Sequence, residues 1–177
     1  MEIPFTINCM EIRVLNENDA AEWCRIRLEA LESDPFAFGK SAEELRAISA
    51  EIIAQRFRES SSRYFNLGAF ENGQLVGTAT FMREKGLKEQ HKGHVYAVYV
   101  SASQRGKGAG HALIAALVEK AKQDSSLEHI LLCVASTQQA ARQLYRSFGF
   151  ETFGTEPRSL KIGSTYIDED HMLLRVR

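Results

Sequence analysis

The sequence predicts a single α/β domain built around one mixed β-sheet, and three observations lead to this fold class. An apolar, β-branched run at residues 94–100 ends in a glycine-rich turn and continues into an amphipathic stretch at 107–122, the pattern of strand, turn and helix. A short apolar strand at 130–134 follows at the spacing of a right-handed crossover, so it is expected to pair in parallel with residues 94–100. Hairpin patterns at 64–82 and 150–176 predict antiparallel strands around this parallel pair.

Length, composition and charge limit the classes of protein to which the chain can belong. With 177 residues, of which 44% are hydrophobic and 25% charged, it is long enough for one globular domain with a sizeable core. The formal net charge of −1 gives no electrostatic case for nucleic acid or an anionic membrane as a partner. No apolar run approaches the ~18 residues of a membrane-spanning helix, and residues 1–10 lack the basic and apolar regions of a signal peptide. We therefore expect a cytoplasmic protein in which residues 1–10 are at most a short N-terminal extension.

The cysteines and histidines do not predict a metal site. Cys9, Cys24 and Cys133 are odd in number and widely spaced, and the last two lie in apolar patterns, so buried free thiols in a reducing compartment are expected. His91 and His94 form an H-x-x-H pair, but no carboxylate or cysteine stands beside them.

Apolar periodicity and capping signals predict the remaining elements. In order, the expected elements are a strand at 11–15, helices at 19–32 and 41–59, strands at 64–70 and 75–82, a charged exposed loop at 83–92, the strand, helix and strand named above, a helix at 136–148, and strands at 150–161 and 165–176. Capping boxes that begin at Asp19, Ser41 and Ser136 open three of the helices. Pro35 and Gly149 stop the first and the last helix.

The turn after residue 100 combines glycines with cations, which predicts a binding site for an anion. Gly106, Gly108 and Gly110 permit positive φ, so that consecutive backbone N–H groups can face one concavity. Arg105 and Lys107 add charge at the start of a helix, where a cation is unfavourable unless an anion binds. Ordinary surface charges are the alternative, but they leave the glycines unexplained, because a glycine inside a helix costs ~1 kcal/mol relative to alanine.

The spacing of these residues excludes two common phosphate-binding loops. A Walker-type loop requires Lys-Ser or Lys-Thr after its last glycine, and the glycines here give G-x-G-x-G instead of the dinucleotide fingerprint G-x-G-x-x-G. A generic nucleotide-phosphate binder is therefore disfavoured. Residues 105–110 instead match R/Q-x-x-G-x-G/A, which resembles the pyrophosphate loop of the GNAT superfamily of N-acetyltransferases.

A second stretch resembles the same family. Residues 138–150 follow the family pattern N-x-x-A-x-x-L-Y-x-x-x-G-F, except that Gln138 replaces the asparagine. The succession of predicted elements is also the GNAT order, so the resemblance covers nearly the whole chain from about residue 11. It implies one GNAT domain over residues 1–177, with a mixed, mostly antiparallel, twisted sheet of about seven strands, about four helices, and parallel fourth and fifth strands that splay apart.

The resemblance implies that acetyl-CoA binds along the splayed strands and the glycine turn. The pantetheine would pair with main-chain groups near Val98, Tyr99 and Val100, where a backbone N–H would also stabilise the developing oxyanion of the thioester. Gln138 would contact the pantetheine or the phosphates in place of the family asparagine. The residues expected around the pyrophosphate are Arg105, Gly106, Lys107, Gly108, Ala109, Gly110 and His111.

The resemblance also implies a catalytic role for Tyr145, because the family tyrosine at this place lies near the thioester sulfur. A phenol, with a pKa of ~10 against ~8.5 for a thiol, is a suitable proton donor to a departing thiolate. The alternative is that Tyr145 is one more apolar residue on the buried stripe of its helix.

Two residues are candidates for the general base. An alkylamine acceptor, with a pKa of ~10, must lose a proton before it attacks the thioester. Family members often use a carboxylate on the central strands, but none lies between Val95 and Ser103. The first candidate is His94 at the start of its strand, and its alternative is an exposed strand-end residue without a catalytic role. The second is Glu44, in the expected wall of the acceptor site, and its alternative is a helix-capping role. Acidic residues 168–170 would either attract a cationic acceptor or simply be solvated.

These observations predict an acetyl-CoA-dependent N-acetyltransferase that moves the acetyl group directly to a primary amine of a small molecule or of a peptide N-terminus or lysine. Cys133 is not expected to act as a ping-pong nucleophile, because it lies in an apolar strand with no histidine partner in the sequence. A non-catalytic acyl-CoA-binding or sensing module of the same fold is the alternative function. The last strand is expected to be exposed, so it could pair with a second subunit in a homodimer.

Overall fold

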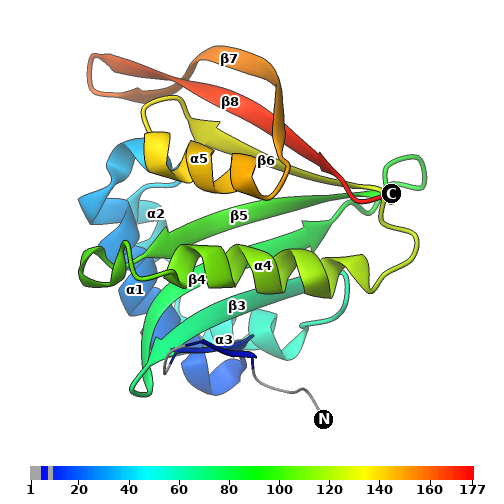
Figure 1. Cartoon of the computed structure of the whole chain (residues 1–177). Helices are drawn as coiled ribbons and strands as arrows, with labels where there is room; N and C mark the ends of the chain where they lie inside the picture. The colour runs from blue at the N-terminus through cyan, green and yellow to red at the C-terminus, as the bar shows by residue number, and fades with distance from the viewer. Residues whose placement is uncertain (1–4, 8–9) are drawn as a thin grey trace.

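One eight-stranded sheet organises the chain (Figure 1). The computed structural model describes residues 5–7 and 10–177, and the strands in that part of the chain follow the order β1-β2-β3-β4-β5-β6-β8-β7. They are β1 (Phe5–Ile7), β2 (Met10–Val14), β3 (Tyr64–Glu71), β4 (Gln74–Arg83), β5 (Lys92–Val100), β6 (His129–Ala135), β7 (Glu151–Ile162) and β8 (Thr165–Arg175). Among these described strands, only β5 and β6 pair in parallel, as the sequence predicts.

This mixed, mostly antiparallel sheet confirms the predicted fold class and adds one strand to the expected seven. The additional strand is β1, which pairs antiparallel with β2 so that Phe5 stands opposite Ile12. Part of the expected N-terminal extension is therefore built into the sheet.

Five α-helices are present in the described residues, and they cover both faces of the sheet. They are α1 (Ala20–Ser33), α2 (Ala42–Arg46), α3 (Ala50–Arg58), α4 (Ala109–Lys122) and α5 (Gln139–Ser147). Figure 1 shows α4 and α5 over one face and α1, α2 and α3 behind the other. Among the described residues, no helix combines the length and the apolar character that crossing a membrane requires.

Residues 41–59 form two helices instead of the single predicted one. Ser41 opens α2 with the predicted capping box, in which its side chain accepts from the Glu44 N–H and the Glu44 side chain accepts from the Ser41 N–H. Helix α2 then ends at Arg46, and Ser49 begins α3 by accepting a hydrogen bond from the Ile52 N–H. A serine that binds helical backbone donors in this way starts a new helix inside a periodic stretch.

The other two predicted capping boxes are wrong. Asp19 is the N-cap residue of α1, but its side chain caps no helical N–H of α1; its carboxylate accepts two hydrogen bonds of 2.7 Å from the Arg13 guanidinium. Asn16 caps the 3-10 turn Glu17–Asp19 that precedes α1. Helix α5 begins after Gln138 without a side-chain cap, so Ser136 does not open it.

Two apolar cores lie on the two faces of the sheet. The larger core packs α4 and α5 against the sheet and includes Leu113 together with Phe65 and Phe81, whose rings stack 5.2 Å apart. The smaller core packs α1 and α3 against one end of β3, β4 and β5, around Ile26 and Tyr99. Together these two cores hold β5 on both faces, which makes it the central strand of the domain.

The parallel strands β5 and β6 separate after three residue pairs, which confirms the predicted splay. The paired residues are Lys92 with His129, Gly93 with Ile130, and His94 with Leu131. Beyond His94, β5 keeps its ladder only with β4, so the side of β5 that faces β6 has main-chain groups outside any ladder.

A β-bulge lies in the separated part of β5. Tyr96 pairs with Thr80 and Tyr99 with Thr78, so two residues of β5 oppose one residue of β4. Ala97 in this bulge has a φ of +53°. A non-glycine residue in that conformation costs of order 1–3 kcal/mol, and such strain recurs at functional sites.

The C-terminal hairpin reverses at Gly163, as predicted, but its last strand is not exposed at an edge. Strand β8 lies between β6 and β7, so the edge strand is β7 and the expectation of an exposed last strand is wrong. The register of β7 shifts between Glu156 and Leu160, at Pro157 and Arg158, and Arg158 has a φ of +58°. The homodimer itself stays a prediction.

Candidate active site

The glycine turn between β5 and α4 has the geometry that an anion site needs. Gly106 and Gly108 have φ values of +76° and +90°, and a Cβ at either position would have no atom within 4 Å. Helix α4 starts at Ala109, two residues later than predicted, because the left-handed Gly108 is its N-cap. The result is a turn with open space at two glycines, at the N-terminus of a 14-residue helix, and its residues fit the pyrophosphate of acetyl-CoA.

The next three residues pack the turn against the domain. A Cβ on Gly110 would lie 3.3 Å from Leu144 of α5 and 3.9 Å from Val100 of β5, so this glycine permits a close approach of three elements. Ala109 is buried, and the ring of His111 lies 4.7 Å from that of Phe148 on α5. Ala109, Gly110 and His111 therefore hold the turn in position beside β5 and α5.

The two cations of the turn differ in what they contact. Arg105 Nε donates to the Val100 carbonyl at 3.0 Å, and its Nη2 donates to Asp34 at 2.9 Å, so this side chain braces the end of β5. The Lys107 side chain is exposed and forms no hydrogen bond or ion pair with the residues that the structure describes. Lys107 is therefore the cation of the turn that is free to meet an anion.

Asp34 is a site residue that sequence reasoning missed. It caps the C-terminus of α1, and its carboxylate accepts from Arg105 and, at 3.3 Å, from the side-chain amide of Gln138. It thus joins the loop after α1 to the turn after β5 and to the start of α5. The local signal at Asp34 indicates only the end of a helix, because both partners lie far away in the sequence.

Tyr145 is buried on α5 at 6% exposure, and its ring lies edge-on to that of Phe150, 5.9 Å away. Burial raises the pKa of its phenol above the ordinary value. The phenol is therefore protonated at neutral pH, as a proton donor must be, but the raised pKa makes it a weaker acid than an exposed tyrosine. Leu144, the preceding residue, contacts the position of Gly110, so α5 packs against the glycine turn.

Three predicted pantetheine-binding residues lie in the separated part of β5. Val98 and Val100 are half-buried and pack against the larger core. Tyr99 points to the other face, where its hydroxyl donates to Glu29 at 3.0 Å and lies 3.1 Å from the Ser33 hydroxyl. The side chains thus fix the strand, and the main chain of the bulge is left for a ligand.

His94 has the contacts of a base that is neutral at physiological pH. Its Nε2 lies 3.0 Å from the carboxylate of Glu84, and its ring stacks on Tyr96 with centroids 5.7 Å apart. Burial lowers the pKa of His94, and the charge of Glu84 opposes that shift. Glu84 is the carboxylate that the strand itself lacks, and sequence reasoning missed it because it lies in the loop after β4.

Glu44, the other candidate base, is exposed and already has partners. Its carboxylate accepts from the Ser41 N–H at 2.8 Å and from Lys40 Nζ at 2.9 Å. The Ser41 N–H lowers the pKa of this carboxyl most, and Lys40 adds to the effect. These contacts favour the capping role of Glu44.

Cys133 is not buried, contrary to the prediction, and it has a histidine partner. Its Sγ lies 3.3 Å from Nδ1 of His171 on β8, and Nε2 of that ring lies 3.3 Å from Glu156 on β7. Partial desolvation raises the pKa of the thiol, and Glu169 and Glu156 raise it further. The thiol therefore stays protonated, which makes it a poor nucleophile. Cys24 is half-exposed, so it is not fully buried either, and Cys9 lies outside the described residues.

The acidic residues of β8 are also engaged. Asp170 forms an ion pair of 2.6 Å with Arg142 and accepts from Thr155. Asp168 accepts from the Arg158 N–H, and the Glu169 carboxylate accepts from Ser159. In the described part of the chain, no three histidine, cysteine or acidic side chains are grouped so that they could hold a metal ion.

Comparison with known proteins agrees with this geometry. The model of the Acetyltransferase (GNAT) family matches residues 25–150. Over 105 residues the chain is 31% identical to the L-methionine sulfoximine/L-methionine sulfone acetyltransferases of Pseudomonas aeruginosa and Pseudomonas paraeruginosa, which covers 59% of this chain and 60% of each relative. The protein therefore belongs to the GNAT acetyltransferase family, as its two sequence motifs predict.

Solved structures confirm the fold. A GNAT-family acetyltransferase from Streptococcus pneumoniae superimposes with a TM-score of 0.86 at 24% identity, over 95% of this chain and 99% of that one. The Salmonella typhimurium protein yncA, solved with its cofactor acetyl-CoA, gives a TM-score of 0.83 at 22% identity, over 96% of this chain and 95% of that one.

Proposed function

We propose that this protein is an acetyl-CoA-dependent N-acetyltransferase that transfers the acetyl group directly to a primary amine. The observation that carries the proposal is the meeting of three elements at Gly110, where the end of the splayed strand β5, the first turn of α4 and the tyrosine-bearing helix α5 come together. This meeting supports the proposal, because the glycine turn, the separated part of β5 and the helix that carries Tyr145 contact one another there. Membership of the GNAT family supports the same activity.

The residues would divide the work as follows. Gly106, Lys107 and Gly108 would bind the pyrophosphate, and the main chain at the Ala97 bulge would hold the pantetheine and face the thioester carbonyl. Tyr145 would donate a proton to the departing thiolate.

His94, oriented by Glu84, would accept the proton of the amine, directly or through a water molecule. Because burial lowers the pKa of its imidazole, the neutral form that can act as a base predominates at neutral pH. Glu44 is the weaker candidate, since its carboxylate is already bonded to Ser41 and Lys40.

The acceptor is proposed only as a class, a primary amine of a small molecule or of a peptide. The curated relatives are named for acetylation of L-methionine sulfoximine and L-methionine sulfone, which favours a small molecule. A non-catalytic acyl-CoA-binding module remains the second candidate, because it would use the same glycine turn to bind CoA.

Two measurements test the proposal. Acetyl-CoA should raise the melting temperature of the protein. Gly108→Glu should abolish that rise, because it introduces a side chain and a negative charge into the glycine turn. A panel of amines should then show release of free CoA thiol that depends on both acetyl-CoA and the amine. Binding without turnover on any amine would favour the non-catalytic module, and a melting temperature unchanged by acetyl-CoA would contradict both functions.

A further inference from the structure

A basic cavity lies beside the proposed base, on the face of the sheet opposite α4. Its volume is about 610 Å³, and it opens between the C-terminal end of α3 and the ends of β3 and β4. Four basic residues and one acidic residue line it, namely Arg56, Arg63, Arg83, Lys85 and Glu59, and the charge of Arg83 is already paired with Asp124. The excess of positive charge indicates a site for an anionic group.

Three of these cations have no partner that neutralises them at close range. In the described part of the chain, the side chains of Arg56, Arg63 and Lys85 form no hydrogen bond or ion pair, although Arg63 acts electrostatically on Asp124. Arg58, on the same helix but outside the cavity, contrasts with them, since it bonds Glu51 at 2.8 Å. Three cations without a close partner therefore lie together at the cavity.

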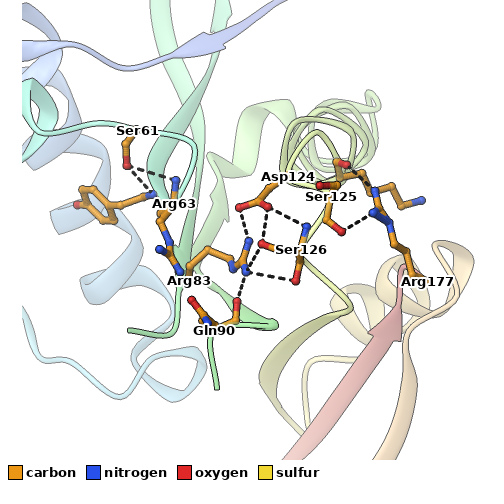
Figure 2. A network of polar contacts seen from close by, with 10 residues as sticks. Ser61, Arg63, Arg83, Gln90, Asp124, Ser125, Ser126 and Arg177 are labelled. Carbon is orange, nitrogen blue, oxygen red and sulfur yellow. Dashed lines mark hydrogen bonds and ion pairs between the residues drawn. The ribbon is translucent and has the colours of Figure 1, made fainter. Parts of the chain in front are cut away.

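Arg83 also lines the cavity, but its guanidinium is directed to Asp124 and Ser126 (Figure 2). The sequence predicts an exposed loop from residue 83, but Arg83 ends β4 and its side chain is 1% exposed. Its guanidinium is held by Asp124, Ser126 and the Gln90 carbonyl. Its Nε is buried and has no hydrogen-bond partner among the described residues. Its backbone N–H donates to the Arg63 carbonyl at 2.7 Å, which fixes Arg63 next to it.

The cavity and the base share one row of the sheet. Tyr64 and Met82, which line the cavity, stand opposite each other on β3 and β4, and Met82 stands opposite His94 on β5. Directly opposite residues lie on the same face, about 5 Å apart from strand to strand. A ligand in the cavity is therefore one or two strand spacings from the pair of His94 and Glu84.

We infer that this cavity binds the carboxylate of the acceptor, so that the substrate class is an amine that also carries a carboxylate, such as an amino acid. The inference rests on the proposed acetyltransferase function. The ammonium group of such a molecule is attracted to Glu84 and gives its proton to His94, while its carboxylate meets Arg63, Lys85 and Arg56. Opposite charges in adjacent positions match the two ends of a zwitterion.

The test compares acceptors that differ only in the carboxylate. Glycine, β-alanine, 4-aminobutanoate and L-methionine sulfone are each assayed beside the corresponding primary amide, with acetyl-CoA in excess. We expect kcat/KM to favour at least one carboxylate form by about ten-fold or more, the size of one charge-assisted hydrogen bond. Arg63→Gln and Lys85→Gln should remove that preference through KM, with kcat and the rates on the amides little changed.

Arg58→Gln is the matched control, since it removes a cation from the same helix outside the cavity. A second measurement does not depend on activity: glutarate, which has carboxylates and no amine, should shift the side-chain Nε–H resonances of arginine in NMR spectra of the parent and of Arg58→Gln, with smaller shifts in Arg63→Gln.

The outcomes separate the two proposals. If no amine is acetylated while glutarate shifts the arginine resonances as expected, the acetyltransferase function fails and the anion site stands. If amines are acetylated with no preference for the carboxylate form, or if Arg63→Gln lowers the rates on acids and amides equally, the carboxylate site is overturned.

Discussion

Asp34 and Gln138, 104 positions apart in the sequence, are joined by a hydrogen bond of 3.3 Å from the Gln138 amide to the Asp34 carboxylate. The other oxygen of the same carboxylate accepts from Arg105. Gln138 follows β6 and Arg105 follows β5, the two strands that separate from each other. Asp34 therefore bridges the gap at its open end, where the cofactor is proposed to enter.

Asp34→Asn should weaken the use of acetyl-CoA. The amide keeps the size of the side chain but loses the charge-assisted hydrogen bond to Arg105, so the end of β5 is held less firmly. We expect KM for acetyl-CoA to rise about 3-fold to 10-fold, with a smaller change in kcat. Glu32→Gln is the control, since Glu32 forms an exposed ion pair with Arg46 at the same end of α1. A lower KM in Asp34→Asn would instead mean that Asp34 competes with the cofactor for Arg105.

Tyr145→Phe should lower kcat and leave the affinity for CoA nearly unchanged. Loss of the phenol removes the proposed proton donor, while the ring that packs on Phe150 remains. The expected decrease in kcat is about 10-fold to 100-fold, at the lower end of the range for general acid catalysis. Steady-state rates and calorimetric titration with CoA measure the two quantities, and Tyr166→Phe, at an exposed tyrosine of β8, is the control. Equal turnover would make Tyr145 a packing residue.

The lowered pKa of His94 predicts how kcat/KM depends on pH. Because burial lowers its pKa below the ordinary value of 6.5, the acidic limb of kcat/KM should fall below that pH. His94→Gln should be slower and should lack this limb, whereas His91→Gln should keep it. An identical pH profile in His94→Gln and the parent would eliminate His94 as the base.

The same shift in the pKa of His94 affects stability. The unfolded chain binds the proton more tightly than the folded protein, so the contribution of His94 to stability is fully present above its unfolded pKa of 6.5. It is lost as the pH falls through 6.5 toward the lower folded pKa. The melting temperature of the parent should therefore fall more steeply over this interval than that of His94→Gln.

Cys133→Ser should remain active, because direct transfer needs no thiol and the raised pKa keeps this one protonated. We expect kcat within about 2-fold of the parent, and no acetylated protein by mass spectrometry after mixing with acetyl-CoA alone. Cys24→Ser is the matched control. An acetyl adduct on Cys133, together with a large loss of rate in the serine variant, would indicate a covalent route through Cys133, His171 and Glu156.

Features encoded by adjacent residues could be predicted from the sequence. Asn72 and Gly73 form the predicted hairpin turn with φ values of +51° and +79°, and Gly149 follows α5 with a φ of +88°. The glycine turn before α4 was found for the same reason, since its spacing and its conformation are both local.

Features that depend on distant contacts could not be predicted. The contacts of Asp34 and the pairing of His94 with Glu84 join segments that the sequence leaves unrelated. The exposure of Cys133 could not be predicted, because its strand is entirely apolar and shows no alternation that would indicate which face is buried. In the structure, β6 is fully buried on only one face. The bulge at Ala97 could not be predicted from the sequence either, since no glycine or polar residue stands there.

The shift in register at Pro157 bears on how the molecule behaves at high concentration. An edge strand is a template for another chain, but β7 lacks a backbone donor at Pro157 and bends at Arg158. A strand of another molecule could pair with β7 on only one side of this irregularity. A continuous sheet therefore cannot extend from one molecule to the next. The edge formed by β7 is thereby protected from aggregation by its own backbone.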